Sequence, residues 1–190
     1  TKGSVKVDGV DVRDMTQKEL RDKLGYVPQK GVLFSGTIDS NIRYGKPEIT
    51  DAQVKEAAEV AQATEFIDTK PEKYESPVSQ GGTNVSGGQK QRLSIARAIA
   101  KDPEIFIFDD SFSALDFKTD SQLRKALKEY TKDATTVIVA QRISTILGAD
   151  QIIVLDDGHM AGIGTHKELM ANCEVYQQIA RSQLSEEELA

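Results

Sequence analysis

The sequence lacks a long hydrophobic run. None of its apolar stretches approaches the roughly 18 residues that a helix needs to cross a bilayer, although 38% of its 190 residues are hydrophobic. We therefore expect these residues not to cross a membrane themselves. Their number is enough for one globular α/β domain with a sizeable core.

The sequence also has little cysteine and no excess of positive charge. Cys173 is the single cysteine, so no disulfide can form within the chain, which favours a reducing compartment. The 24 Lys and Arg residues are outnumbered by 30 Asp and Glu, giving a net charge of −6. Broad nucleic-acid binding depends on cationic side chains. We therefore expect no nucleic-acid partner, while a local basic patch remains open.

A further absence concerns phosphate binding. The pattern GxxxxGK[ST], whose amides and lysine hold nucleotide phosphates in P-loop proteins, occurs nowhere in the 190 residues. Gly82 and Gly87 have the required glycine spacing, but Gly88 stands where lysine is needed. This stretch therefore cannot act as a P-loop.

Turn and cap signals divide the chain into short elements. Asp-Gly pairs at Asp8 and Asp157, each between alternating apolar residues, predict β-hairpins. Capping boxes that start at Thr16, Thr50 and Thr165 predict the first turns of helices.

The elements between these signals are predicted from periodicity. The first helix is expected to carry Leu20 and Leu24 on one face and to end near Gly25, with a strand over 26–29. Residues 33–42 are expected to be an irregular link. Turn chemistry over 71–89 leads into a helix that Pro103 closes.

Two apolar strands follow, at 105–108 and 135–140. An amphipathic helix with Leu123, Leu127 and Tyr130 separates them. This order predicts parallel pairing with both faces of the sheet covered.

Paired carboxylates follow the first of these strands. Asp109 and Asp110 stand at its carboxyl end, where α/β folds place ligand chemistry. One carboxylate together with phosphate oxygens suits Mg²⁺. The alternative is that Asp110 or Ser111 simply caps the next helix, and both interpretations stay open on these residues alone.

A serine and two glycines begin the helix before that strand. Unpaired amides at a helix N-terminus carry partial positive charge and bind phosphate, so Ser86, Gly87 and Gly88 are candidates for such a cradle. The alternative is a flexible loop in which Ser86 is an ordinary N-cap.

Taken together, four motifs resemble those of the nucleotide-binding domain of ABC transporters. They are "VSGGQKQR" (85–92), "IFIFDD" (105–110), "SALD" (113–116) and "VIVAQRIST" (137–145), in the family's order across nearly the whole chain. "LFSGTIDSNI" (33–42) is similar to a segment of the exporter branch.

The resemblance implies a P-loop NTPase-like α/β fold with its N-terminal part missing. Residues 1–190 would then be a partial nucleotide-binding domain. Residues 30–100 would form a helical signature subdomain, 1–29 and 101–180 parts of the RecA-like core, and 181–190 a C-terminal tail.

The resemblance also implies ATP and Mg²⁺ as cofactors. Asp109 takes the place of the magnesium-side aspartate, and Gln29 that of the glutamine that senses Mg²⁺ and contacts the coupling helices of the membrane domains. The residues implied to contact nucleotide are Gln29, Ser86, Gly87, Gly88, Gln89, Ser113 and Asp116.

Three departures from the family pattern qualify this assignment. Without GxxxxGK[ST], the Walker A loop is expected upstream of Thr1, and the isolated fragment is expected to be inactive. Asp110 occupies the place of the catalytic glutamate, and Gln141 the place of the switch histidine. These replacements resemble the degenerate half of heterodimeric bacterial multidrug exporters.

That resemblance implies an ATP-driven export module at the cytoplasmic face of the membrane. Its partners would be a second, non-identical nucleotide-binding domain and transmembrane domains, and its signature loop would complete the partner's site. One alternative is a regulatory module that clamps nucleotide without hydrolysing it. A soluble chromosome-maintenance ATPase is more remote, because residues 58–75 are too short and interrupted for the long coiled coil it requires.

Overall fold

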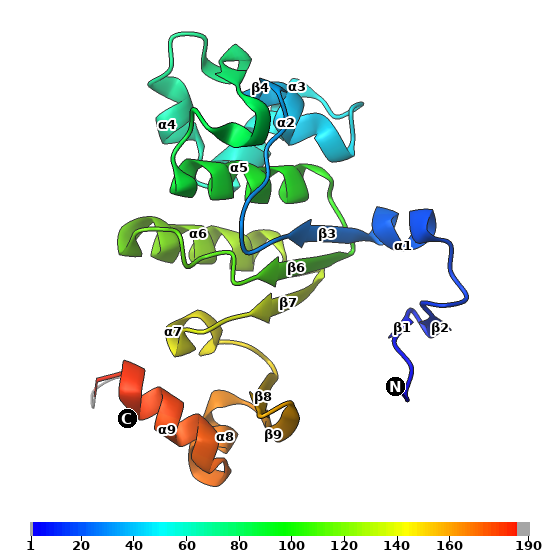
Figure 1. Ribbon diagram of the computed structural model, residues 1–190, viewed down its shortest axis with the longest axis vertical. Coiled ribbons are helices and arrows are strands. Elements are labelled where there is room, and N and C mark those ends of the chain that lie inside the picture. Colours follow the sequence, from blue (N-terminus) through cyan, green and yellow to red (C-terminus); the bar gives the residue numbers. More distant parts are fainter. Residues whose placement is uncertain (1, 186–190) are drawn as a thin grey trace. The chain divides into compact units, whose positions relative to one another are not determined.

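The computed structural model describes residues 2–185 (Figure 1) and divides the chain into two compact units, 1–139 and 140–190. The subdomain boundaries predicted at residues 30 and 100 stay predictions. Of the predicted tail, residues 181–183 end the last helix, and residues 186–190 lie outside the described range. Within residues 2–185, no helix is both long and apolar enough to cross a membrane.

A parallel sheet forms the centre of the first unit. Its strands are β3 (Leu24–Val27), β6 (Ile105–Asp109) and β7 (Thr135–Val139), in the order β3-β6-β7. Val27 pairs with Phe108, and both are buried in one hydrophobic cluster with residues of α5 (Gly87–Ala100) and α6 (Phe117–Tyr130). The predicted α/β class and the parallel pairing are confirmed.

The second face of this sheet differs from the prediction. Tyr26, Ile107 and Val137 are paired across the strands and so point to the same side. Tyr26 is 55% exposed and Val137 is 47% exposed. The prediction that both faces are covered is therefore wrong for this chain.

The first helix is shorter than expected. α1 spans Gln17–Lys23 behind a capping box at Thr16. Leu24 has extended backbone, pairs with Ile105 and begins β3. Leu20 and Leu24 therefore do not share a helical face, because sheet pairing overrides the local periodicity.

The expected irregular link is also partly regular. It contains β4 (Gly36–Thr37) and α2 (Ile38–Ile42), which begins with a Thr37–Ser40 capping box. The remaining elements of this unit are β1 (Lys6–Val7), β2 (Val10–Asp11), η1 (Arg43–Gly45), α3 (Asp51–Val60), α4 (Thr64–Asp68), η2 (Lys73–Glu75), β5 (Pro77–Val78) and η3 (Gln80–Gly82). The capping box predicted at Thr50 is confirmed.

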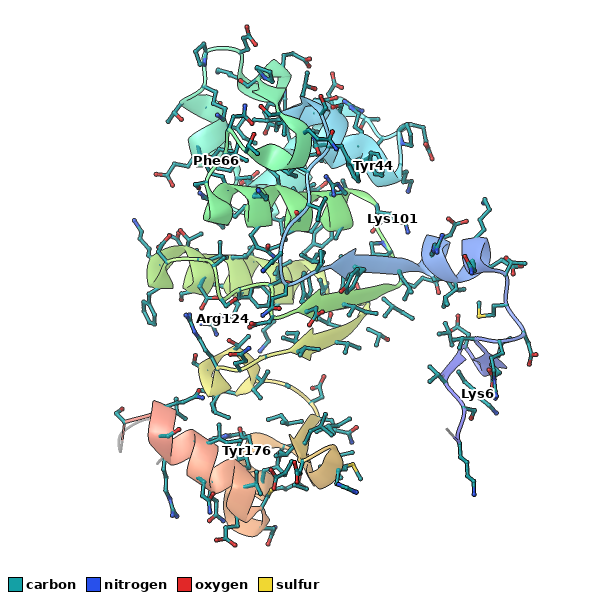
Figure 2. The ribbon with its side chains drawn as sticks, viewed as in Figure 1. Lys6, Tyr44, Phe66, Lys101, Arg124 and Tyr176 are labelled. Atoms are coloured by element: carbon teal, nitrogen blue, oxygen red, sulfur yellow. The ribbon has the colours of Figure 1, made fainter. Side chains whose placement is uncertain are left out.

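The second unit is a hairpin covered by helices. Its elements are α7 (Ile143–Ile146), β8 (Ile152–Asp156), β9 (His159–Gly164), α8 (His166–Asn172) and α9 (Glu174–Gln183). Tyr176, labelled in Figure 2, is only 1% exposed and belongs to its core.

Both predicted hairpins are present. Asp8 and Gly9 turn β1 into β2, and Asp157 and Gly158 turn β8 into β9. All of these turn residues have positive φ, as the two central residues of a type I′ turn require.

Candidate functional site

The carboxyl ends of β3 and β6 bring the predicted site residues together. The strands of this sheet run in the same direction (Figure 1), so their ends meet at one edge. Gln29, just after β3, donates from Nε2 to Asp110 Oδ2 at 3.0 Å. Ser111 Oγ donates to the carbonyl oxygen of Val27 at 2.8 Å. Gln29 and Asp110 are thus held side by side.

Asp110 lies in a turn rather than in a helix cap. Its φ is 44°, a left-handed conformation that aspartate tolerates better than most residues. Its amide donates to Val139 O at 2.9 Å, and its carbonyl oxygen accepts from Ser113 Oγ at 3.0 Å. The next helix, α6, is capped by Asp116. The alternative that Asp110 or Ser111 caps that helix is therefore wrong.

Asp109 lies on the open face of the sheet. The hydroxyl of Tyr26 donates to Asp109 Oδ2 at 3.1 Å. The pKa of Tyr26 is raised, mainly by desolvation of the phenol and then by this bond to the carboxylate. The sequence analysis did not single out Tyr26. The feature that could have identified it is a polar hydroxyl in an otherwise apolar strand.

The donor set at this edge fits a particular kind of metal site. Among residues 2–185, no group of three or more His, Cys, Asp or Glu side chains could hold a metal by itself. Asp109 offers a carboxylate, and Gln29 offers an amide oxygen while its nitrogen binds Asp110. Such a set suits Mg²⁺ that takes its other ligands from phosphates and water.

At the N-terminus of α5, Ser86 caps the helix, and the amides that follow it can still bind phosphate. The Ser86 side chain accepts from Gln89 N, and Gln89 Oε1 accepts from Ser86 N, each at 3.2 Å. Ser86 is therefore an N-cap. The amides of Gly87 and Gly88 belong to the first turn, where a helix supplies no carbonyl partner, so the cap leaves them available to an anion.

The two glycines differ in their surroundings. A Cβ on Gly87 would meet nothing within 4 Å, whereas a Cβ on Gly88 would lie 3.4 Å from the carbonyl oxygen of Ala114. The segment Ser113–Asp116 therefore packs against the start of α5. Asp116 accepts from Thr119 N at 3.0 Å, and this bond, with one from the Thr119 side chain, lowers its pKa.

Gln141 lies at the start of the second unit. Its carbonyl oxygen accepts from Gln183 Nε2 at 2.9 Å, and Gln183 Oε1 accepts from Ile143 N at 2.8 Å. α9 therefore fixes the backbone on both sides of Arg142.

Sequence reasoning missed three polar side chains that hold the site in place. Gln91, Arg97 and Asn41 bind backbone atoms of the segment from Pro28 to Asn41, which contains Gln29. For the two residues on α5, the signal was a polar side chain at every third position, at 91, 94 and 97, on the buried side of the helix.

Comparison with known proteins identifies the family. The ABC transporter family model matches residues 1–113. A Mycobacterium tuberculosis protein named as an uncharacterized ABC transporter ATP-binding protein is 47% identical over 186 residues, which cover 96% of this chain and 32% of that protein. A Staphylococcus aureus protein, whose name assigns it to multidrug export as an ATP-binding/permease protein, is 44% identical over 179 residues, covering 94% and 31%.

A solved structure of a bacterial Atm1-family ABC exporter with ATP bound agrees in fold. It matches with a TM-score of 0.93 and 39% identity, covering 97% of this chain and 33% of that one. The chain thus spans about a third of the length of the relatives it matches. It belongs to the ABC transporter family, as an ATPase domain with the ABC ATPase fold.

Proposed function

We propose that this chain is the ATP-binding and hydrolysis module of an exporter, with a degenerate site of its own and a signature loop that completes a partner's site. The observation that carries the proposal is a contrast within one chain. The cap at Ser86 leaves the Gly87 and Gly88 amides available, while the carboxylate beside Gln29 belongs to an aspartate.

The short carboxylate argues for slow hydrolysis at the chain's own site. Asp110 is one methylene shorter than glutamate, which removes roughly 1.5 Å of reach. A misplacement of about 1 Å can cost on the order of a hundredfold in rate. The chain's other degenerate residue, Gln141, carries a neutral amide, which hydrogen-bonds but neither takes up charge nor passes a proton as histidine does.

The signature loop argues for a role at a second site. Amides at a helix N-terminus stabilise negative charge that develops on a transferring phosphoryl group. The open space at Gly87 allows close approach of such a group from outside the chain.

Mg²⁺, when bound with ATP, neutralises charge on the phosphates. Asp109 and Gln29 would hold it at the chain's own site, and Tyr26 would orient the Asp109 carboxylate through its hydroxyl.

The proposal names two kinds of partner at the cytoplasmic face of a membrane. One is a second, non-identical nucleotide-binding domain that carries a catalytic glutamate. The other is the transmembrane domains, which would contact the chain near Gln29. Multidrug export, named for the Staphylococcus aureus relative, is the transport activity that we infer.

The test is a comparison of two variants in the full-length protein assembled with its glutamate-bearing partner. Ser86→Arg should abolish ATP hydrolysis, because it fills the anion site that the helix terminus offers. Asp110→Asn should change the rate little. Equal damage from the two substitutions would show that Asp110 is the working base and would overturn the degenerate assignment.

A regulatory clamp that binds nucleotide without supporting hydrolysis is the second candidate. The bond between Gln29 and Asp110 favours it, since that bond occupies the carboxylate expected to activate water. Under this alternative, Ser86→Arg would leave the partner's hydrolysis rate intact and alter only its regulation.

A further inference from the structure

A buried glutamine connects the site edge to the signature helix. Gln91 lies on α5 and is only 2% exposed. Its Oε1 accepts from the amide of Gly31 at 2.9 Å, and its Nε2 donates to the carbonyl oxygen of Pro28 at 3.1 Å. These two backbone groups stand on either side of Gln29 in the chain. One side chain therefore holds both ends of the short loop that carries Gln29.

The attachment depends on close approach of the loop to the helix. A Cβ on Gly31 would lie 2.7 Å from Ser94 Oγ and 3.0 Å from both Gln91 Oε1 and Lys90 O. Any larger residue would push the loop away from α5. Glycine at this position therefore permits the close approach to Ser94, Gln91 and Lys90 of α5.

Arg97 continues the attachment along the same face of α5. Its Nη1 donates to Val32 O at 2.8 Å, its Nε to Asn41 O at 2.9 Å, and its Nη2 to Asn41 Oδ1 at 2.9 Å. Its guanidinium also lies over the rings of Phe34 and Tyr44; Tyr44 is labelled in Figure 2. The chain from Pro28 to Tyr44 is thus fixed to α5 by two side chains of that helix.

The signature loop lies at the N-terminus of α5, which is the end nearer to Gln91. Gln89 closes the capping box with Ser86, and Gln91 stands two residues further on. Gln29, in the loop that Gln91 holds, donates to Asp110 at 3.0 Å. Gln91 therefore provides a polar connection between the loop that carries Gln29 and the helix that carries the signature loop.

We propose that Gln91 is a positioning residue that acts through Gln29 and makes the signature loop respond to what Gln29 binds. This inference rests on the proposed function, because it concerns two sites that the proposed function assigns. A buried amide with both hydrogen bonds satisfied resists separation, since leaving either partner buried and unpaired is costly. A displacement of Gln29 is thereby passed to α5 rather than absorbed in the loop.

The test uses the full-length protein with its glutamate-bearing partner. Gln91→Met keeps the length of the side chain and removes both bonds. We expect kcat for ATP hydrolysis to fall about tenfold, with KM for ATP changing less than about twofold. Gln177→Met is the matched control, because Gln177 also donates from Nε2 to a backbone carbonyl, that of Met170, but in the second unit; it should leave kcat unchanged.

A double-variant comparison separates positioning from folding. If Gln91 acts through Gln29, the pair Gln29→Ala with Gln91→Met should be within about twofold of Gln29→Ala alone. Additive losses would overturn the proposal, because independent effects add for residues that do not share a function.

A second variant approaches the same contact from the loop. Gly31→Ala leaves the sequence of α5 unchanged and crowds the contact between the loop and Gln91, so it should reproduce the fall in kcat even if Gln91→Met fails to fold. Unchanged kcat in Gly31→Ala would contradict the proposal. Ser86→Arg in the same assay separates a failure of this inference from a failure of the proposed function. If Ser86→Arg abolishes hydrolysis while the Gln91 and Gly31 variants behave as wild type, the proposed function stands and this inference fails.

Discussion

Gly25 and Gly87 are glycines for different physical reasons. A Cβ on Gly25 would lie 2.7 Å from Pro103 Cγ and 3.3 Å from Ala98 O, whereas a Cβ on Gly87 would meet nothing within 4 Å. Gly25 lets β3 approach the end of α5. Gly87 has no such role within its own chain, which supports a role in contact with a ligand.

Alanine substitutions should separate these two roles. Gly25→Ala is expected to lower the free energy of unfolding by about 1–3 kcal/mol, because it overpacks a closed contact. Gly87→Ala should stay within about 0.5 kcal/mol of wild type or be slightly more stable, since alanine is the better helix former. Urea unfolding of both variants, followed by circular dichroism, measures the difference.

The same pair gives a functional contrast. In the full-length protein with its partner, Gly87→Ala should reduce ATP hydrolysis although the fold is intact. A Gly87→Ala variant that unfolds as readily as Gly25→Ala would show that Gly87 serves the fold after all.

At the scale of elements, capping boxes define several helix starts. They begin α1, α2, α3, α5 and α8. In α8, the Glu168 carboxylate accepts from the amide and the hydroxyl of Thr165 at 2.8 and 2.9 Å. These bonds, the amide first, lower the pKa of Glu168 below its ordinary value.

This lowered pKa predicts how acid affects the second unit. A carboxyl group with a lower pKa in the folded state stabilises the fold above its unfolded pKa of about 4.3. That contribution is lost as pH falls through the folded value. Glu168→Gln keeps an acceptor but cannot titrate, so its stability should fall less than that of wild type between pH 6 and pH 3, measured by urea unfolding.

Glu168→Ala serves as the control for the cap itself. It removes the acceptor at every pH, so it should be less stable than Glu168→Gln at neutral pH. Identical acid sensitivity in wild type and Glu168→Gln would mean that Glu168 does not contribute to the pH dependence.

Local chemistry explains which elements the sequence predicts. Capping boxes at Thr16, Thr50 and Thr165 and the two Asp-Gly hairpins are encoded within a few neighbouring residues, and all are confirmed. α2 was missed because its cap uses serine at the third position instead of glutamate or glutamine. Local patterns therefore predict an element only where its usual cap residues are present.

Non-local contacts explain the rest. Leu24 became a strand residue because it pairs with Ile105, a partner that periodicity cannot reveal. For the candidate site, the position of Asp109 and Asp110 after an apolar strand was predictable from the run of residues itself. The bonds of Gln91 to Pro28 and Gly31 were not, since they join residues about 60 positions apart.

At the scale of the whole molecule, the sheet of the first unit has one open face. Val139 is 51% exposed at the end of β7 and Tyr26 is 55% exposed on β3. Exposed apolar side chains grouped on one face are typical of an interaction surface. Asp109 lies on this face beside Tyr26, so the exposed face borders the proposed metal site.

These features together predict how ATP hydrolysis differs between the chain alone and the chain with its partner. The 190 residues contain no GxxxxGK[ST], so nothing in them supplies the lysine and amide loop that hold the β and γ phosphates. The signature cap at Ser86, in contrast, is present and formed. The isolated chain should therefore show no ATP hydrolysis above background.

Mixed with a glutamate-bearing partner domain, however, the same chain should raise the partner's ATP hydrolysis, because under the proposed function its helix terminus completes the partner's site. Ser86→Arg in the chain should remove this stimulation, while Asp110→Asn should preserve it. Phosphate release measured over a range of chain concentrations provides the readout, with the partner domain alone as reference. Hydrolysis by the isolated chain would contradict this prediction, and so would stimulation that survives Ser86→Arg. Either result would mean that the phosphate contacts needed for hydrolysis lie somewhere other than the N-terminus of α5.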